Sequence, residues 1–289
     1  MTTLYWTLFA LLALYLILRF ISLKMYDLKL TPHTETPEKF GLKFEEVHFP
    51  TENDRNLYGW WIPSEKESHS VPTLILVHGW SRNLGRMLRY IQHLHPLNFN
   101  ILAFDARHHG SSDPDNHSSM YKFGQDIHAA VQFACTREID PDRVGVIGLS
   151  IGGAGSVFAA AQDACIKTVI TVGAPAHPVD VMKQEFKRFH IPSLIGWLLL
   201  KQIESKIGMQ YDFFAPVNNI NSAAASFLII HGEDDVVVLP SQGDKLYHAA
   251  RPDQAEYWKI PGRGHSNCHH EPGFWDKVEQ FLRSNLEEN

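Results

Sequence analysis

A serine flanked by glycines lies near the middle of the chain, in "VGVIGLSIGG" at residues 144–153. Gly148, Ser150 and Gly152 fit the pattern G-x-S-x-G, a sharp strand-to-helix turn that exposes a nucleophilic serine. Such a serine needs a base to take its proton, an acid to orient the base, and amides to stabilise the oxyanion. The pattern alone is only a hint, so the remaining groups must be found elsewhere in the chain.

Candidates for the base and the orienting acid follow two later apolar runs. "HGEDDVVV" carries the adjacent carboxylates Asp234 and Asp235, and "PGRGHSNCHH" places His265 in a loop flanked by glycines. A carboxylate that accepts a hydrogen bond from a histidine holds it in the tautomer that can act as a base. Spacing alone does not choose between Asp234 and Asp235.

Two backbone amides are candidates for an oxyanion hole. The helix expected after Ser150 begins at Ile151, and its N-terminus carries free amides and a partial positive charge. His78, Gly79 and Trp80 follow the apolar run "TLILV", and the glycine allows close approach to the serine. We therefore expect the amides of Trp80 and Ile151 to form the oxyanion hole, and we interpret His78 as structural.

A metal centre is the competing interpretation of the last loop. His265, Cys268, His269 and His270 all carry ligand atoms, but their spacing fits no common zinc pattern and no second ligand cluster is present. We expect no metal and no cofactor. The histidines in "FDARHHGSS" are likewise interpreted as part of a hydrogen-bonded loop beside the site.

The elements that must position these residues alternate between strands and helices. Residues 42–50 and 57–63 predict an antiparallel hairpin. Five further apolar runs predict buried parallel strands, "TLILVHG", "FNILAFDA", "RVGVIGLS", "IKTVITVG" and "SFLIIHG", and "AEYWKIPG" predicts a final strand. Helices are expected at residues 120–138, 151–163, 240–250 and 272–286, the last with Pro272 in its first turn. This alternation predicts a doubly wound, mostly parallel sheet with ligands at the carboxyl ends of its strands.

The N-terminal segment differs from the remaining chain. Residues 4–23 are almost entirely apolar, with Arg19 as their only charge, and in a helix they would be about 30 Å long. A cleaved signal peptide would need a positive N-terminal region and a small-residue cleavage site, and a buried helix is rarely apolar on all sides. We predict a transmembrane anchor at 1–25 and a linker at 26–40. Arg19, Lys24 and Lys29 favour a single-pass protein with its catalytic domain on the cytoplasmic side.

Composition excludes several classes of protein. The chain has 289 residues and a net charge of −6, with 44% hydrophobic and 20% charged residues. These values are typical of a globular protein, and without basic runs they argue against a nucleic-acid partner. The three widely spaced cysteines, Cys135, Cys165 and Cys268, suggest no disulfide framework and are interpreted as ordinary thiols in a reducing compartment.

Taken together, these motifs resemble the α/β-hydrolase superfamily across residues 42–286. The resemblance is carried by "LVHGW", "FDARHHGSS", "GLSIGG", "IHGEDDVVV" and "PGRGHSN" and by the order Ser, Asp, His. It implies that Asp235 is the acid and His265 the base, and that Asp105 is structural. One departure from the family pattern is His108, where many relatives have glycine; this departure concerns the shape of that loop and not the Ser, Asp, His order.

The resemblance implies a hydrolase domain at 41–289. Val179, Met182, Phe186 and Phe189 recur at helical spacing and predict an amphipathic helix, and the apolar segment "IPSLIGWLLLKQI" follows, so we expect a helical cap at about 176–222. Such a cap covers the site with apolar surface, so the expected substrate is a carboxylic ester or thioester, with acyl or lipid-like compounds as candidates, cleaved through an acyl-enzyme. Peptidase or perhydrolase chemistry on the same fold and a non-catalytic binding protein are the alternatives. Dehalogenase and epoxide-hydrolase activities are disfavoured, because relatives with those activities have a carboxylate nucleophile at the position that Ser150 occupies.

Overall fold

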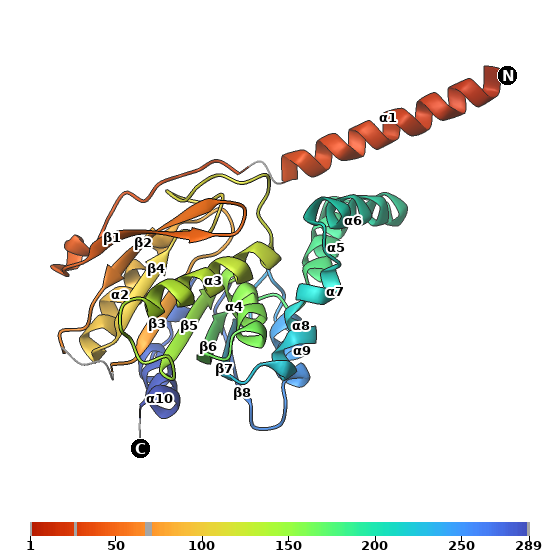
Figure 1. Ribbon diagram of the computed structural model, residues 1–289. Coiled ribbons are helices and arrows are strands. Elements are labelled where there is room, and N and C mark those ends of the chain that lie inside the picture. The colour runs from red at the N-terminus through yellow and green to blue at the C-terminus, as the bar shows by residue number, and fades with distance from the viewer. Residues whose placement is uncertain (1, 26–27, 67–70, 288–289) are drawn as a thin grey trace.

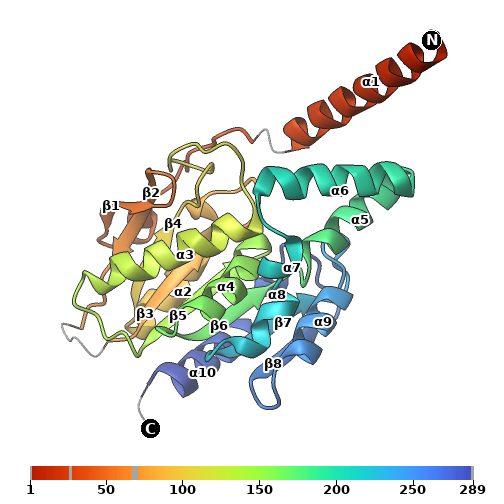
Figure 2. The same cartoon turned by 45° about the vertical axis from the view of Figure 1, so that its right-hand side comes forward.

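One eight-stranded sheet forms the centre of the molecule in the computed structural model, which describes residues 2–25, 28–66 and 71–287. The strand order is β1-β2-β4-β3-β5-β6-β7-β8, and helices cover both faces of the sheet (Figures 1 and 2). The strands are β1 Glu45–Thr51, β2 Arg55–Ile62, β3 Thr73–Val77, β4 Asn100–Phe104, β5 Val144–Leu149, β6 Ile166–Val172, β7 Ser226–Gly232 and β8 Ala255–Ile260. The predicted doubly wound sheet is confirmed.

The topology follows from the pattern of apolar runs. β1 and β2 form the predicted antiparallel hairpin and β2 pairs antiparallel with β4, whereas β4, β3, β5, β6, β7 and β8 run parallel. In β3, Ile75 and Val77 face one layer of helices, and Leu74 and Leu76 face the other. A strand buried on both faces must be apolar at every position, which is why "TLILV" shows no alternation.

Helices α3 Met120–Cys135, α4 Ile151–Gln162 and α9 Ser241–Ala249 contribute to the core on one face, and α2 Leu88–Leu94 and α10 Phe274–Leu286 to the core on the other. The prediction for the last helix was wrong at its start. Pro272 lies outside α10, because Gly273 adopts a left-handed conformation (φ 78°) and the helix begins at Phe274. A helix cannot continue through a residue with that backbone geometry.

The predicted cap consists of α5 Pro178–Arg188, α6 Ser193–Ile207, α7 Tyr211–Phe214 and α8 Pro216–Asn219, followed by a 3₁₀ turn at Ile220–Ser222. Its apolar side chains form a third core with Met120 and Phe158 of the main domain. The cap therefore shares a core with the helices below it rather than packing only on itself.

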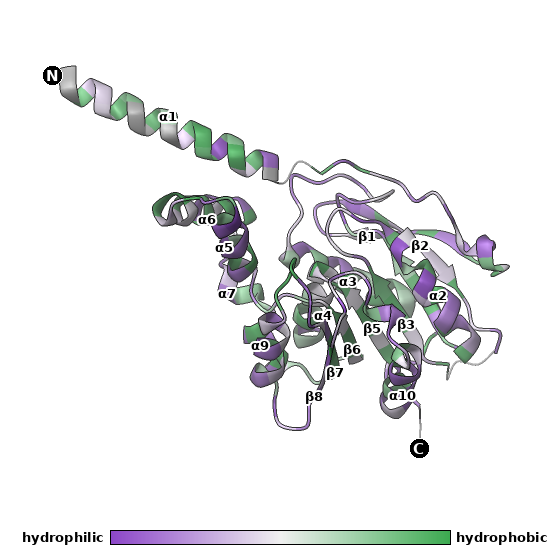
Figure 3. Ribbon diagram, turned by 180° about the vertical axis from the view of Figure 1, so that it is seen from behind, coloured by the Kyte–Doolittle hydropathy of each residue, from purple (hydrophilic) through white to green (hydrophobic). Residues whose placement is uncertain are grey.

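The N-terminal helix α1, Thr2–Met25, projects from the body of the molecule and carries hydrophobic residues along its length (Figure 3). Near its C-terminal end, Leu18 is buried in the core of the cap, beside α6. Within the described part of the chain, no helix is both long enough and apolar enough to span a membrane. The predicted transmembrane anchor therefore stays a prediction, and residues 1, 26 and 27 of the predicted anchor and linker lie outside the described residues.

Candidate active site

Ser150 occupies the turn between β5 and α4. Its backbone has φ 53° and ψ −120°, a region that residues other than glycine rarely adopt and that costs roughly 1–3 kcal/mol. The Ser150 amide donates a hydrogen bond to the Val172 carbonyl oxygen at 2.9 Å, which ties the turn to β6. The strained turn is thus held by the sheet, and it presents the serine at the carboxyl edge of the parallel strands.

The glycines around Ser150 are needed because backbone segments approach closely. A Cβ atom on Gly152 would lie 2.3 Å from the His78 carbonyl oxygen, and one on Gly148 would lie 2.5 Å from the backbone of Gly152. Both distances are shorter than any real contact allows. The turn therefore requires hydrogen atoms at these positions and brings the His78–Trp80 loop against the serine.

Asp235 and His265 form a hydrogen-bonded pair beside this turn. The Nδ1 atom of His265 lies 2.7 Å from Oδ2 of Asp235, which is buried, while the neighbouring Asp234 is exposed. The other carboxylate oxygen of Asp235 accepts hydrogen bonds from the amides of Val237 and Val238, each at 2.9 Å. The structure thus distinguishes the two adjacent carboxylates that spacing could not separate.

The surroundings of Asp235 keep it ionised. Burial alone would raise its pKa, but hydrogen bonds with His231 and His265 and the amide of Val238 hold the pKa well below its usual range. His231 also lies 2.8 Å from the Val238 carbonyl oxygen through its Nε2 atom. A permanently charged, fixed carboxylate can orient the His265 ring and stabilise its protonated form.

The loops beside the serine are fastened by buried polar groups, as expected. Nε2 of His78 accepts a hydrogen bond from the Ala106 amide at 3.1 Å, and Asp105 accepts from the amides of Leu84 and Ser111 at 2.6 and 2.8 Å. Burial raises the pKa of Asp105 to about 7 and lowers that of His78 to about 3. His108 takes a positive φ of 65°, which explains why glycine is suited to that position.

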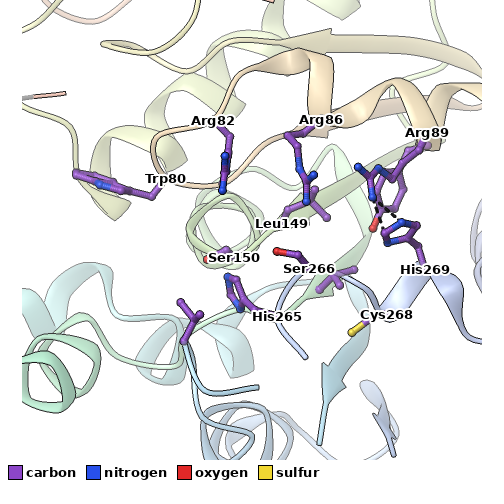
Figure 4. Close-up of a pocket in the computed structure, with 14 residues that line it drawn as sticks. Trp80, Arg82, Arg86, Arg89, Leu149, Ser150, His265, Ser266, Cys268 and His269 are labelled. Atoms are coloured by element: carbon purple, nitrogen blue, oxygen red, sulfur yellow. Dashed lines mark hydrogen bonds between the residues drawn. The ribbon is translucent and has the colours of Figure 1, made fainter. Parts of the chain in front are cut away.

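Two pockets meet at Ser150. The apolar pocket, of about 350 Å³, lies under the cap and is lined mainly by apolar side chains such as those of Met120, Val181, Met182 and Phe214. The arginine pocket, of about 310 Å³, lies on the side of α2; its lining includes Arg82, Arg86, Arg89, His265, Ser266 and His269 (Figure 4). Trp80, Ser150 and Val237 belong to both linings. A bound substrate can therefore extend to both sides of the serine.

The structure places the other predicted groups as follows. Trp80 and Ile151 both line the apolar pocket next to Ser150, and a Cβ atom on Gly79 would lie 3.3 Å from the Cβ of Ser150. Among residues 2–25, 28–66 and 71–287, no three His, Cys, Asp or Glu side chains are grouped so as to hold a metal ion. In the last loop His265 is engaged by Asp235 and His269 by Arg89.

Sequence reasoning missed two groups at this site. His231 ends the run "SFLIIHG" and was not assigned a role, although it contacts the buried carboxylate. Arg82, Arg86 and Arg89 were also missed, because charges at helical spacing are usual on a solvated surface. Their spacing of four and three residues, which places them on one side of a helix, was the only available signal.

The chain is similar in sequence to several known proteins. Residues 68–212 match the family described as "Serine aminopeptidase, S33". The uncharacterized protein YfhR of Escherichia coli K12 is 30% identical over 212 residues, covering 72% of this chain and 68% of that protein. The human α/β hydrolase domain-containing protein 17C is 26% identical over 217 residues, covering 74% and 59% of the two chains.

The fold is shared with solved hydrolases. The esterase Pf2001 of Pyrococcus furiosus superposes with a TM-score of 0.72 at 22% identity, covering 90% of this chain and 100% of that chain. An acetyl xylan esterase from Paenibacillus sp. R4 gives a TM-score of 0.68 at 19% identity, covering 91% and 98% of the two chains. The molecule is an α/β hydrolase by its fold and its sequence motifs. Within that superfamily, the chain belongs to the family of serine aminopeptidase S33 hydrolases.

Proposed function

We propose that this protein is a serine hydrolase that cleaves carboxylic esters or thioesters through an acyl-enzyme. The observation that carries the proposal is the 2.7 Å hydrogen bond between buried Asp235 and half-buried His265 beside Ser150, which stands on a strained turn at the meeting point of two pockets. Acyl transfer by a serine requires a charged acid, an oriented base and a hydroxyl that the substrate can reach, and Ser150 lines both pockets.

In the proposed mechanism, His265 takes the hydroxyl proton as Ser150 attacks the carbonyl carbon. Asp235 stabilises the imidazolium that forms and holds its ring. The amides of Trp80 and Ile151 donate hydrogen bonds to the oxyanion, and α4 adds the partial positive charge of its N-terminus. His265 then protonates the leaving group, and a water molecule, activated by the same histidine, releases the acid from the acyl-enzyme.

The apolar pocket is the proposed site for the acyl chain. Its walls come largely from the cap, with further lining from α3, α4 and the loops after β3 and β7. Most of its exposed lining is carbon, so a hydrocarbon chain would replace water there at a gain of about 25 cal/mol for each Å² buried. This supports an acyl, lipid-like substrate and requires no cofactor.

The test of the proposal is labelling with a fluorophosphonate probe, followed by a panel of esters, thioesters and amides of graded acyl length. A fluorophosphonate reacts only with an activated serine, so we expect one labelled site, lost in Ser150→Ala. Turnover of esters and thioesters but not amides is the expected result. Hydrolysis of N-terminal amides instead would support a peptidase, the activity in the family's description.

We also propose that α1 attaches the protein to a membrane, with the catalytic domain on the cytoplasmic side. Large apolar side chains are exposed on α1, including Trp6 and Phe9, and on the neighbouring α6 at Leu194 and Trp197. Such surface is more favourable in lipid than in water. The positive charges at Arg19, Lys24 and Lys29 support the orientation.

Flotation of the full chain with phosphatidylcholine vesicles in high salt tests this attachment. The wild type is expected to float, and Leu8→Glu with Leu12→Glu, on exposed positions of α1, is expected to remain in the soluble fraction. Tyr247→Glu, at an exposed position of α9, is the matched control. Equal flotation of the wild type and both variants, or no flotation of the wild type, would contradict the proposal.

A further inference from the structure

The arginine pocket has the electrostatics of an anion site. Arg82, Arg86 and Arg89 line it on the side opposite His265 and Ser266, and Figure 4 shows the side chains of Arg82 and Arg86 extending toward Ser150 and Ser266. The described residues that line this pocket include no aspartate or glutamate. Three guanidinium groups therefore share one cavity with the proposed nucleophile.

Within residues 2–25, 28–66 and 71–287, no carboxylate pairs with these positive charges. In the described part of the chain, no carboxylate lies within 4 Å of the guanidinium nitrogens of Arg82, Arg86 or Arg89. Arg89 instead contacts the ring of His269. Burial and the nearby Arg89 charge lower the pKa of His269 to about 4, so this ring is neutral at pH 7 and leaves the charge of the cluster unchanged. Burial and the charges of Arg89 and Arg82 likewise lower the pKa of Arg86.

The segment that carries the arginines is held in place before any ligand binds. It follows β3: Arg82 precedes a 3₁₀ turn at Leu84–Met87, which carries Arg86 and continues into α2, which carries Arg89. The side chain of Asn83 caps this turn by accepting a hydrogen bond from the Gly85 amide at 3.0 Å, and buried Asp105 accepts one from the Leu84 amide at 2.6 Å. A preorganised cluster of like charges is stabilised when an anion enters it.

We propose that the arginine pocket binds a phosphate group on the leaving half of the substrate, so that the enzyme hydrolyses acyl esters or thioesters of phosphorylated alcohols or thiols. This inference rests on the proposed serine hydrolase function. A phosphate monoester carries close to two negative charges at pH 7, and its oxygens match the paired N–H donors of a guanidinium group. A carboxylate carries one negative charge and therefore neutralises less of the positive charge of the three arginines.

The two pockets divide the substrate at the scissile bond. The acyl chain enters the apolar pocket and the phosphorylated half enters the arginine pocket, with the carbonyl carbon at Ser150. The bond from this carbon to the ester oxygen or thioester sulfur breaks, and His265 delivers to the leaving atom the proton taken from Ser150. Water then gives its hydroxyl to the acyl carbon and its other proton to Ser150, so the products are a carboxylic acid and a free phosphorylated alcohol or thiol.

Three matched octanoyl esters test the inference: those of 3-hydroxypropyl phosphate, of 1,3-propanediol and of 3-hydroxypropanoate. The measured quantity is the ratio of kcat/KM for the phosphate ester to kcat/KM for the neutral propanediol ester. We expect a ratio of roughly 100 in the wild type, from two charge-assisted contacts of about tenfold each, and a lower ratio for the carboxylate ester. The ratio should fall as salt is added.

The double variant Arg82→Gln with Arg86→Gln is expected to lower the phosphate ratio to within a few-fold of one. Turnover of the neutral ester reports that the variant is folded. Arg283→Gln removes one positive charge from α10, away from both pocket linings, and should keep the wild-type ratio, which controls for the overall change in charge.

The outcomes separate the two proposals. A wild-type ratio near one, a higher ratio for the carboxylate ester, or an unchanged ratio in the double variant would overturn the phosphate pocket while the serine hydrolase proposal stands. If the wild type cleaves none of the three esters and Ser150 takes no fluorophosphonate label, the proposed function is wrong and the phosphate pocket falls with it.

Discussion

Ser150 lies between two regions that are held together by different interactions. On the side of the sheet, β5, β7 and β8 end in loops whose buried polar groups are joined by short hydrogen bonds, such as that between Asp235 and His265. On the side of the cap, α5 to α7 contribute mainly apolar side chains packed in a shared core. Hydrogen bonds depend on direction and hold the reacting side chains in one orientation, which suits the loops to catalysis. Apolar contacts tolerate changes in side-chain shape, which suits the cap to selecting the substrate.

The largest expected effect is on the loop side. Ser150→Ala should lower kcat by roughly a million-fold, as loss of the nucleophile does in other serine hydrolases, because the remaining groups cannot form an acyl-enzyme. The measurement is steady-state turnover of a short ester, with circular dichroism to show that the fold is retained. Substantial remaining turnover would remove Ser150 from the mechanism.

The next effect separates two neighbouring carboxylates. Asp235→Asn should lower kcat by roughly ten-thousand-fold, because an amide at this position favours the wrong tautomer of His265. Asp234→Asn is the matched control, since this side chain is exposed and should change kcat by less than about tenfold. If Asp234→Asn proves more damaging, the assignment of the orienting acid is wrong.

A smaller effect is expected on the cap side. Met182→Trp should fill part of the apolar pocket and lower kcat/KM for an octanoyl ester by about tenfold or more relative to an acetyl ester, because each methylene in such a pocket contributes about 1–3 kcal/mol. Lys183→Trp adds the same side chain at the next, exposed position of α5 and should leave the ratio unchanged. Equal ratios in the two variants would mean that acyl chains bind elsewhere.

The smallest expected effect is on the pH dependence of stability and comes from His109, in a loop on the sheet side of Ser150. Burial lowers the pKa of His109 to about 4, whereas an unfolded histidine titrates near pH ~6.5. Between these values the unfolded chain binds a proton that the folded chain does not, so the unfolding free energy should fall as pH falls, by up to about 1.4 kcal/mol per pH unit. His109→Leu should make this slope shallower by up to about 1.4 kcal/mol per pH unit in urea titrations between pH 6.5 and pH 4, while the contributions of His78 and His269, whose pKa values are also lowered, remain.

Measurements at pH 8 provide the reference, since this histidine is neutral in both states there and no slope is expected from it. An equally steep loss of stability in wild type and His109→Leu would show that other buried groups control the acid response.

Much of the fold could be predicted because it depends on local pattern. Each buried strand is an apolar run of five to seven residues bounded by polar or glycine residues, and the helices between them have clear periodicity. Boundaries were less certain: the start of α10 was misplaced because the conformation of Gly273 cannot be inferred from its identity alone. The relation of α1 to the cap was also unpredictable, since the burial of Leu18 depends on α6, far along the chain.

For the candidate site, the sequence by itself determined the residue types, their order and the turn that carries Ser150, because glycine patterns and strand ends are local properties. Only the tertiary structure decided that Asp235 is buried against His265 while Asp234 faces solvent, since adjacent residues differ only in where the folded chain directs them. The same holds for Arg82, Arg86 and Arg89. Their significance is that they share a pocket with a serine more than sixty positions away, and proximity of that kind arises only when the sheet brings the ends of β3 and β5 side by side.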